Sequence, residues 1–557
     1  MATLVVVESP AKCRTIQRCL GGGYLVRASL GHLRDLPAAR RGRKGAVALG
    51  LDPDKAWKAT WEVPPDRRDV VAGLRRLAGR TAPVVLATDC DREGEAIAWH
   101  LRQLLGGAAG RFARVTFSEI TESAIRAAFQ APRRLDVGLV HAQLTRRFVD
   151  RLVGWRVSPA LVRAVDQARS AGRVQSVAAR LVVEREREIA AFRPAPYWEV
   201  AVTLETPGGP TVFPVAESGD AESADADRFA GEAEAREAAA AIRAAGTARV
   251  VSVRSEPGDR RAHPPFTTSS LQQAASARLK LTVARTMELA QRLYEAGAIT
   301  YMRTDAVALS AEAERGLRSQ VAAAYGGEYV ADPPNRFKAA GGAQEAHEAI
   351  RPTSFDPKGG PALDGDEARL YELVRRRALQ SQMAPARVRK DRVEARAGGW
   401  RLALAGVAVL FPGFEAAWPP DREDPAVPLL EEGAELRVCD VAVAAKRTRA
   451  PKRFTQATLV RELDTRGIGR PSTYAQTIAV LLERGYVESR RRDLAATALG
   501  DRTVAWLMRH FGDLLDYSFT AQLERELDEI AAGSREWRGV LDAFHRRLIE
   551  QVERASA

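Results

Sequence analysis

The sequence predicts a multidomain protein of α/β and α+β parts, and three observations carry that prediction. The chain has 557 residues, which is too long for a single hydrophobic core. Short apolar runs followed by helical spacing recur in its first part, as in an open α/β sheet. Strand-like alternation dominates two later stretches, and the C-terminal part has mainly helical spacing.

The N-terminal part begins with a predicted buried strand at residues 4–7. Ser9 is placed to cap the helix that follows, with Pro10 in its first turn. The three glycines at 21–23 end that helix. This strand-to-helix unit is the first sign of a parallel sheet.

A second buried strand is predicted at residues 84–87, and residues 95–105 have helical spacing that ends at two glycines. If the two strands are parallel, Glu8, Asp89 and Asp91 lie at their carboxyl ends. Open α/β sheets bind ligands at that edge. The sequence therefore places an acidic site there.

The rest of the chain alternates between segments with helical spacing and segments rich in predicted strands. Residues 143–188 are helical and rich in arginine, and residues 198–260 are strand-rich, with an Ala/Glu/Asp-rich excursion near 216–245. A helical block then contains Tyr301 and runs to about residue 385. Strands resume to about residue 450, where a basic run at 446–453 is predicted to be a linker before the helical end.

Composition favours a polyanionic partner. Lys and Arg number 84 against 71 Asp and Glu, which gives a formal charge of +13 and a pI near 9.8. Many proteins without a nucleic-acid function share that bias, so the charge is supporting evidence only. The four cysteines form no C-x-x-C pair, which argues against a zinc ribbon or a disulfide framework and favours a reducing compartment.

The sequence lacks the patterns of export, membrane insertion and ATP hydrolysis. It has no basic leader followed by a long apolar segment and no apolar run of membrane-spanning length. No G-x-x-x-x-G-K-[ST] loop occurs either. We therefore expect a cytoplasmic protein with no membrane partner and no use of ATP.

The acidic cluster after the second strand, together with Glu8, is a candidate magnesium site. Mg²⁺ prefers hard oxygen ligands and keeps several waters, so a few carboxylates suffice to hold it beside a phosphate. The predicted ligands are Glu8, Asp89, Asp91 and Glu93. A solvated loop is the alternative, because D-x-D is common; Glu at position 93 disfavours a D-x-D-x-T phosphatase nucleophile. Lys12, in the first turn after Glu8, is placed to reach a bound phosphate.

Tyr301 is the candidate nucleophile. Arg303 lies two residues later, and a guanidinium there would stabilise the tyrosine oxyanion and neutralise a phosphate. An interior tyrosine is usually structural, but Arg303 and Asp305 after an apolar run indicate a polar pocket, because burying them unpaired is costly. His347 would donate to a phosphate or pair with a carboxylate; the alternative is a histidine satisfied in place.

Two segments have features of DNA-binding elements. The stretch SAGRVQS at 170–176 begins a helix after a small-residue turn, so its amides, Arg173 and Gln175 could grip a sugar-phosphate chain; an ordinary capped helix is the alternative. Residues 455–487 predict helix, tight turn, helix and strand, which is similar to a winged helix-turn-helix; a packing unit without a DNA-binding role is the alternative.

These residues occur in motifs that resemble bacterial type IA DNA topoisomerases, the topoisomerase I class, over nearly the whole chain. Eight stretches match in the family's order: VESPAK from Val7, GHLRDLP from Gly31, TDCDREGEAIAWH from Thr88, SAGRVQS from Ser170, PPFTTSSLQQAAS from Pro264, YEAGAITYMRTD ending at Asp305, QEAHEAIRP from Gln344 and RGIGRPSTYA from Arg466.

The resemblance implies a Toprim α/β domain followed by a toroidal core with winged-helix-like elements. The expected domains are Toprim at 1–153, a helical DNA-binding domain at 154–197 and 449–557, a β-rich hinge or arch at 198–260 and 386–448, and a helical domain with the catalytic tyrosine at 261–385. The family's bacterial members often carry a C-terminal zinc-ribbon tail. This chain has no C-x-x-C pair, so we expect the core without that tail.

The resemblance also implies the chemistry. Tyr301 would cleave one DNA strand through a 5′-phosphotyrosine, the other strand would pass, and religation would relax negative supercoils with Mg²⁺ and without ATP. A monomer acting on the nucleoid would suffice. Glu8, Asp89 and Asp91 match the acidic triad, and Lys12 and Arg303 match phosphate contacts.

The remaining site residues are also carried over from the resemblance. His347 matches an active-domain histidine. The residues expected along the single-strand path, beside Arg303, are His32, Arg146, Arg147, Asp150, Trp155, Ser170, Ala171, Gly172, Arg173, Val174, Gln175 and Tyr486. Trp155 would offer a stacking face for a base.

Two other functions fit parts of the sequence. One is a Toprim protein of primase or nuclease type, which would make a nucleotidyl product or permanent nicks without a protein adduct. The other is a non-enzymatic DNA-binding scaffold, for which Tyr301→Phe would change nothing measurable.

Overall fold

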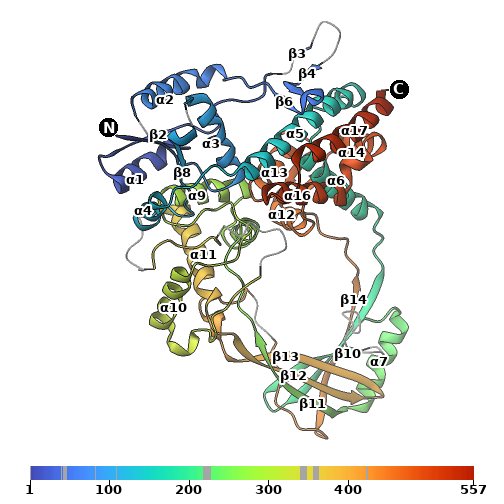
Figure 1. Cartoon of the computed structure of the whole chain (residues 1–557). Coiled ribbons are helices and arrows are strands. Elements are labelled where there is room, and N and C mark those ends of the chain that lie inside the picture. Colours follow the sequence, from blue (N-terminus) through green and yellow to red (C-terminus); the bar gives the residue numbers. More distant parts are fainter. Residues whose placement is uncertain are drawn as a thin grey trace.

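The computed structural model describes residues 2–38, 40–41, 47–81, 83–107, 109–216, 228–338, 348–355, 363–421 and 425–556. Its ribbons are arranged as a ring, with a helix-rich body that holds both termini and a β-rich arch opposite it (Figure 1). Along one side the long strands β9 and β14 join the body to the arch, and along the other side helices α8 to α11 do so. None of the described helices is long and apolar enough to cross a membrane.

The N-terminal sheet has four parallel strands in the order β2-β1-β7-β8. Leu4 of β1 lies opposite Val84 of β7, which confirms the predicted parallel pair. The strands are β1 (Thr3–Val7), β2 (Tyr24–Ala28), β7 (Val84–Leu86) and β8 (Phe112–Arg114). The surrounding elements are α1 (Pro10–Leu20), α2 (Arg68–Arg80), α3 (Arg92–Leu105), α4 (Glu122–Gln130), the short strands β3 (Arg40–Arg41), β4 (Val47–Ala48), β5 (Leu51–Asp52) and β6 (Lys58–Ala59), and the turns η1 (Pro53–Lys55), η2 (Pro65–Arg67) and η3 (Ala109–Arg111).

Strand β1 separates two cores because its side chains alternate between the two faces of the sheet. Leu4 and Val6 pack in one core with residues of α2 and α3. Val5 and Val7 pack in the other core, which also contains Tyr301. The sheet is therefore a wall between its own helices and the segment that carries the candidate nucleophile.

The helical body is built around α5 (Val137–Ala164), which passes without a break through position 153, where the sequence suggests the end of the first domain. The four-domain division itself stays a prediction. The other helices of the body are α6 (Arg173–Ala191), α12 (Gln456–Thr465), α13 (Tyr474–Glu483), α14 (Ala498–His510), α15 (Gly512–Leu515), α16 (Tyr517–Ala531) and α17 (Trp537–Ser556). Helices α12 and α13 are followed by the hairpin of β15 (Val487–Arg490) and β16 (Asp493–Ala496), as the predicted winged helix-turn-helix requires.

The arch is a closed barrel of strand order β10-β13-β12-β11-β14-β9. Its strands are β9 (Pro196–Thr206), β10 (Gly209–Ala216), β11 (Thr247–Arg260), β12 (Ala386–Ala397), β13 (Trp400–Phe411) and β14 (Glu435–Arg447). Helix α7 (Glu232–Ala245) packs alanines and Ile242 into the barrel core, so the Ala/Glu/Asp-rich excursion is partly a core helix; residues 217–227 lie outside the described residues. Strand β14 also takes the first two residues of the predicted linker at 446–453.

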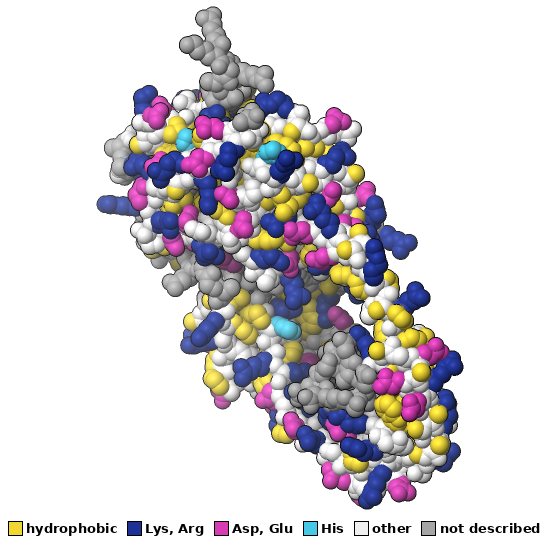
Figure 2. All heavy atoms as spheres, turned by 90° about the vertical axis from the view of Figure 1, so that its right-hand side faces the viewer, with side chains coloured by type: hydrophobic (Ala, Val, Ile, Leu, Met, Phe, Trp, Pro, Cys, Tyr) yellow, Lys and Arg dark blue, Asp and Glu magenta, His cyan; other side chains and the backbone are white. Residues whose placement is uncertain are grey.

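The side of the ring that carries Tyr301 is helical, as predicted. Its elements are α8 (Thr268–Ala274), the π-helical η4 (Ala275–Leu279), α9 (Val283–Glu295), α10 (Ala311–Tyr325), η5 (Gly327–Tyr329), α11 (Gly365–Ser381) and the short η6 (Gly413–Ala416). Tyr301 itself lies in the loop between α9 and α10. Figure 2 shows Lys and Arg spread over body and arch with Asp and Glu among them, so on this face the positive charge does not form one patch.

Candidate active site

The carboxyl ends of β1 and β7 bring together the first site residues. The backbone amide of Asp89 donates a 2.9 Å hydrogen bond to Oε1 of Glu8, which joins the two strand ends. Lys12, in the first turn of α1, bonds to Oδ1 of Asp89 and is only 1% exposed. Ser9 caps α1 by accepting from the Lys12 amide, which fixes the direction of this lysine. Lys12 therefore lies beside the acidic cluster, and its contact with a phosphate stays a prediction.

Asp91 begins α3 and explains why that helix starts three residues earlier than its apolar spacing suggests. Its Oδ1 accepts a 2.8 Å hydrogen bond from the Gly94 amide, as an N-cap residue does. Gly94 has no room for a side chain, because an added Cβ would lie 2.2 Å from the backbone oxygen of Asp89. The tight turn therefore holds both aspartates against the helix start.

Tyr301 meets this turn directly. Its hydroxyl donates a 2.6 Å hydrogen bond to Oδ2 of Asp91, and the residue is 3% exposed. Its backbone amide donates to Ser118 at 2.7 Å, and Thr300 donates to Ala349 at 2.7 Å, so the loop is fixed from two sides. The ring of Tyr294 lies edge-on at 5.2 Å. The candidate nucleophile is thus held at the acidic strand ends.

Arg303 and Tyr301 strongly perturb each other. Burial alone would lower the pKa of Arg303, but the charges of Tyr301 and Asp91 raise it above its ordinary value. Burial, followed by Asp91 and Asp89, raises the pKa of Tyr301 well above 10, while Arg303 opposes that rise. The tyrosine is therefore a neutral phenol in this state, and its oxyanion would need the cations around it.

The donor set suits a hard divalent cation. Burial, together with the nearby charges of Asp89 and Asp91, raises the pKa of Glu8 to about 8, although Lys12 opposes the rise. Carboxylates that repel one another in this way are the ligands Mg²⁺ prefers. The described residues contain no group of three His, Cys, Asp or Glu already gathered as for a metal. Lys12 bonds to Asp89 and Tyr301 bonds to Asp91 in this structure. The Mg²⁺ site stays a prediction.

Glu93 lies on the other side of the turn, in contact with the predicted site residue His32 and with Gln143, which sequence reasoning missed. His32 shares a 2.6 Å hydrogen bond with Glu93 Oε1, and Gln143 of α5 donates to Oε2 at 3.2 Å. Burial would raise the pKa of Glu93, but the His32 hydrogen bond and nearby charges lower it overall. Glu93 therefore links the sheet to α5.

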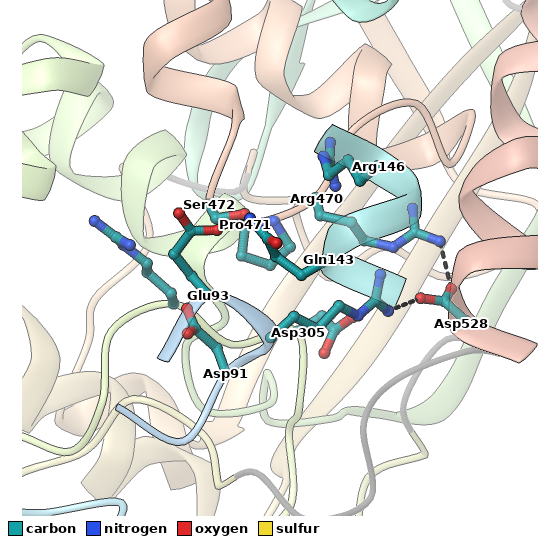
Figure 3. A pocket seen from close by; sticks show the side chains of 11 residues that line it. Asp91, Glu93, Gln143, Arg146, Asp305, Arg470, Pro471, Ser472 and Asp528 are labelled. Atoms are coloured by element: carbon teal, nitrogen blue, oxygen red, sulfur yellow. Dashed lines mark hydrogen bonds and ion pairs between the residues drawn. The ribbon is translucent and has the colours of Figure 1, made fainter. Parts of the chain in front are cut away.

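A cavity of about 80 Å³ lies where the sheet, the Tyr301 loop and the helical body meet. Its lining residues include Asp91, Glu93, Arg303 and Asp305, with Arg470 from the turn before α13 (Figure 3). Asp528 of α16 holds Arg470 at 2.5 Å and also pairs with Arg92. Sequence reasoning missed Asp528 and Arg470 as site residues. Arg470 belongs to the matched RGIGRPSTYA stretch, which was the available signal for it.

A groove of about 290 Å³ continues along the start of α6. The predicted residues that line it are Arg146, Asp150, Ser170, Ala171, Gly172, Arg173, Val174 and Gln175. Arg173 is 2% exposed and pairs at 2.7 Å with the buried Glu524, which also meets Arg146 at 3.2 Å. Arg173 is therefore engaged inside the body here. Sequence reasoning missed Glu524, which the helical spacing of α16 does not distinguish from its neighbours.

The other predicted DNA contacts have varied surroundings. Tyr486 is 3% exposed, and its hydroxyl accepts from the amides of Arg169 and Ser170 at 3.0 Å and donates to the Ser170 carbonyl at 2.8 Å. Tyr486 therefore fixes the backbone of residues 169–170, which we call the groove loop, from the buried side of the groove. Trp155 is 39% exposed, and Arg147 pairs with Asp35 at 2.5 Å. His347 lies outside the described residues.

The fold and site define a Toprim protein whose ring brings a buried tyrosine to the acidic strand ends. A family model described as Toprim domain matches residues 3–120, and one described as DNA topoisomerase matches residues 134–542. The chain belongs to the bacterial type IA DNA topoisomerase family and is an enzyme of that class.

Relatives and a solved structure agree with this family. The chain is 43% identical to DNA topoisomerase 1 of Pseudomonas aeruginosa, over 99% of this chain and 67% of that protein. It is 41% identical to DNA topoisomerase 1 of Escherichia coli, over 99% of this chain and 66% of that protein. It superimposes on full-length topoisomerase I of Thermotoga maritima with a TM-score of 0.87 at 35% identity, covering 99% and 90% of the two chains. The chain thus spans about two thirds of the length of these curated relatives.

Proposed function

We propose that this chain relaxes negatively supercoiled DNA by cleaving, passing and rejoining single strands. Tyr301 attacks a phosphodiester, the new bond joins its oxygen to phosphorus, and the bond to the 3′ oxygen breaks. The products are a 5′-phosphotyrosine and a free 3′-hydroxyl, and the reverse attack rejoins the strand. No ATP is consumed, because the phosphotyrosine conserves the phosphodiester bond.

The observation that carries the proposal is the 2.6 Å hydrogen bond from the Tyr301 hydroxyl to Asp91, with cations close by. Asp91 accepts the phenol proton at Oδ2. Arg303 stabilises the phenolate and the phosphate charge, and Lys12, held by Asp89, reaches the phosphate from the helix start. Glu8 donates a proton to the 3′ oxygen as that oxygen leaves, and it takes the proton back when the strand is rejoined.

Mg²⁺, when bound by the carboxylates of Glu8, Asp89 and Asp91, would supply positive charge beside the phosphate. The single strand would approach along the groove at the start of α6 and past Arg146. A monomer suffices for this scheme because one tyrosine performs both cleavage and rejoining. His347 and the cytoplasmic, nucleoid-bound location stay predictions.

The alternative functions have less support. The family match extends through residues 134–542, beyond the Toprim domain that a primase or nuclease would share. A scaffold would not need a buried tyrosine hydrogen-bonded to the acidic turn.

Incubation of supercoiled plasmid with Mg²⁺ and no ATP tests the proposal, beside Tyr301→Phe and the matched control Tyr294→Phe. We expect stepwise relaxation and protein linked to 5′ ends after denaturation, both lost in Tyr301→Phe. The Tyr294 hydroxyl is buried and has no hydrogen-bond partner among the residues that the structure describes, so its removal should leave the 5′ adduct. Relaxation that persists in Tyr301→Phe would exclude this nucleophile.

A further inference from the structure

A second large cavity lies outside the active site, at the junction of the Tyr301 helices with the arch. Its volume is about 640 Å³, within the range of ligand pockets. Its walls come from the end of β11, from α8 and η4, from α11, and from η6 with the residues that follow. The residues that line it include Arg261, Gln273, Arg278, Arg377, Gln380 and Trp418.

Arg377 forms one wall of this cavity and has no carboxylate partner among the described residues. Its guanidinium lies 4.6 Å from the ring centre of Phe266 and 4.8 Å from that of Trp418. Its Nε is buried and has no hydrogen bond to any part of the chain that the structure describes. Burial and the nearby Arg278 lower its pKa to about 10, so it remains a cation at pH 7. A half-buried cation of this kind is held ready for an anion.

Gln380 provides the second observation. The residue is 1% exposed, and its Oε1 has no hydrogen-bond partner in the described structure. A buried acceptor without a donor is costly, and a ligand that donates an N–H would satisfy it. The cation Arg377 suits a phosphate, and the acceptor of Gln380 suits an N–H on the edge of a base. A nucleotide unit carries both groups, so it matches this pair better than inorganic phosphate does.

The positive charge of the cavity is only partly balanced. Arg278 stacks 4.3 Å from Trp418 and pairs with the exposed Asp421 at 3.2 Å, and Arg260 pairs with Glu415. Arg261 is exposed on the same wall and has no ion pair within the described ranges. Arg261 and Arg377 are therefore the cations that remain for a ligand.

Helix α8 separates this cavity from the nucleophile. Its Thr268 donates to the Met302 carbonyl at 2.6 Å and so holds the Tyr301 loop on one face. Ser270, Gln273 and Ala274 lie on the cavity face. A strand attached to Tyr301 and a strand in this cavity would therefore lie on opposite sides of α8.

We propose that this cavity binds the sugar-phosphate backbone of a single DNA strand other than the strand held at Tyr301. The inference rests on the proposed function, because only strand passage brings a second strand to the ring. Arg261 and Arg377 bind phosphate, and Gln380 accepts from a base. Backbone binding of this kind has little sequence preference and is sensitive to salt.

Calorimetric titration of the full chain with a short oligothymidylate, without Mg²⁺ and at low salt, tests the proposal. We expect two classes of binding sites in the parent protein. Arg261→Gln should weaken one class about tenfold, because it removes a charged hydrogen bond, and should reduce the salt slope by about 0.7. Gln273→Glu should weaken the same class, since it adds a negative charge with almost no change in shape.

The control is Arg236→Gln on α7, because the side chain of Arg236 is 73% exposed and does not line the cavity. It should retain both classes. A single class in the parent, or variants that behave like Arg236→Gln, would overturn the proposal. Inorganic phosphate is titrated in parallel; binding as tight as that of the oligothymidylate, with the same sensitivity to the variants, would make this a free-anion site and overturn the DNA assignment.

Failure of the proposed function gives a different result. If the parent shows two binding classes but no 5′ adduct with Mg²⁺, the cleavage chemistry is wrong and the second DNA site stands. If the adduct forms and only one class binds, the cleavage chemistry stands and the cavity assignment is wrong.

Discussion

The hydroxyl of Tyr301 and Oδ2 of Asp91 lie 2.6 Å apart, although 210 positions separate them in the sequence. Asp91 uses its other oxygen to cap α3, so one carboxylate both fixes the turn and receives the tyrosine. The position of the Tyr301 hydroxyl therefore depends on the N-terminus of α3. A substitution that keeps the cap but removes the charge can distinguish the two roles of Asp91.

Asp91→Asn should keep the cap and lose the charge. Asparagine caps helices as well as aspartate does, so the free energy of unfolding should change little. The variant cannot take the phenol proton as a carboxylate does, and we expect cleavage to fall by about 10²–10⁴. Adduct yield on a single-stranded oligonucleotide measures this. Asp136→Asn, at the cap of α5, is the control and should retain the adduct; equal activity of both variants would remove Asp91 from the chemistry.

Gly94→Ala should disrupt the acidic turn. The added Cβ would lie 2.2 Å from the Asp89 oxygen, so the turn must move and both aspartates with it. We expect loss of the adduct and a destabilisation of about 1–3 kcal/mol, as for overpacking. Gly73→Ala in α2 is the matched control: nothing lies within 4 Å of its Cβ, and alanine there should stabilise the helix by up to about 1 kcal/mol. Denaturant midpoints and adduct yields give both results.

Glu524→Gln should lower stability in a pH-dependent way. Burial would raise the pKa of Glu524, but Arg146, Arg173 and Arg470 lower it well below its ordinary value of 4.5. A carboxyl with a lowered folded-state pKa stabilises the protein above the unfolded pKa and loses that contribution as the pH falls through the folded pKa. At pH 7 we expect a loss of about 3–5 kcal/mol, because Arg146 and the buried Arg173 lose the negative charge of Glu524 that compensates them.

The pH series provides the check on Glu524. The difference between parent and Glu524→Gln in free energy of unfolding should be full at pH 7 and should shrink only below about pH 4.5, where the unfolded carboxyl takes up a proton. Glu550→Gln, whose side chain is 67% exposed and pairs only loosely with Arg554, is the control and should change stability by less than about 0.5 kcal/mol. A difference that does not vary with pH would contradict this ionic role.

Sequence reasoning predicted the sheet edge well because its signals are local. Apolar runs define β1 and β7, and the residues after them must meet if the strands are parallel, so Glu8 and Asp91 could be placed together from the sequence. The motif around Tyr301 also indicates a polar pocket. The contact between Tyr301 and Asp91 depends on how the whole chain closes into the ring of body and arch. No local sequence pattern encodes that closure.

The buried partners of the arginines were not predictable in the same way. Glu524 and Asp528 lie on α16 among other acidic residues with the same helical spacing, and only the packing of α16 against α5 and α6 selects them. Tyr486 was expected to contact DNA, yet the fold places it beneath the groove loop. An aromatic residue at the edge of a motif does not reveal whether its hydroxyl meets a ligand or a backbone.

Tyr486→Phe should therefore weaken DNA binding indirectly. The tyrosine hydroxyl accepts from the amides of Arg169 and Ser170 and donates to the Ser170 carbonyl, so its removal leaves these backbone groups without their partner. We expect a destabilisation of about 1–3 kcal/mol and weaker single-strand binding, because the loop no longer has one fixed shape. Fluorescence anisotropy with a labelled oligonucleotide measures the affinity.

The control for Tyr486 is Tyr517→Phe. Its hydroxyl donates to Glu184 at 2.5 Å on the helical body, and the residue does not line the groove. Both variants should lose stability, but only Tyr486→Phe should lose affinity for the single strand. If Tyr486 contacted DNA directly, its loss would lower affinity with the loop still ordered, and amide hydrogen exchange at residues 169–172 would match the parent. A positioning role requires faster exchange at the amides of Arg169 and Ser170, because these two amides lose their hydrogen bonds to the Tyr486 hydroxyl.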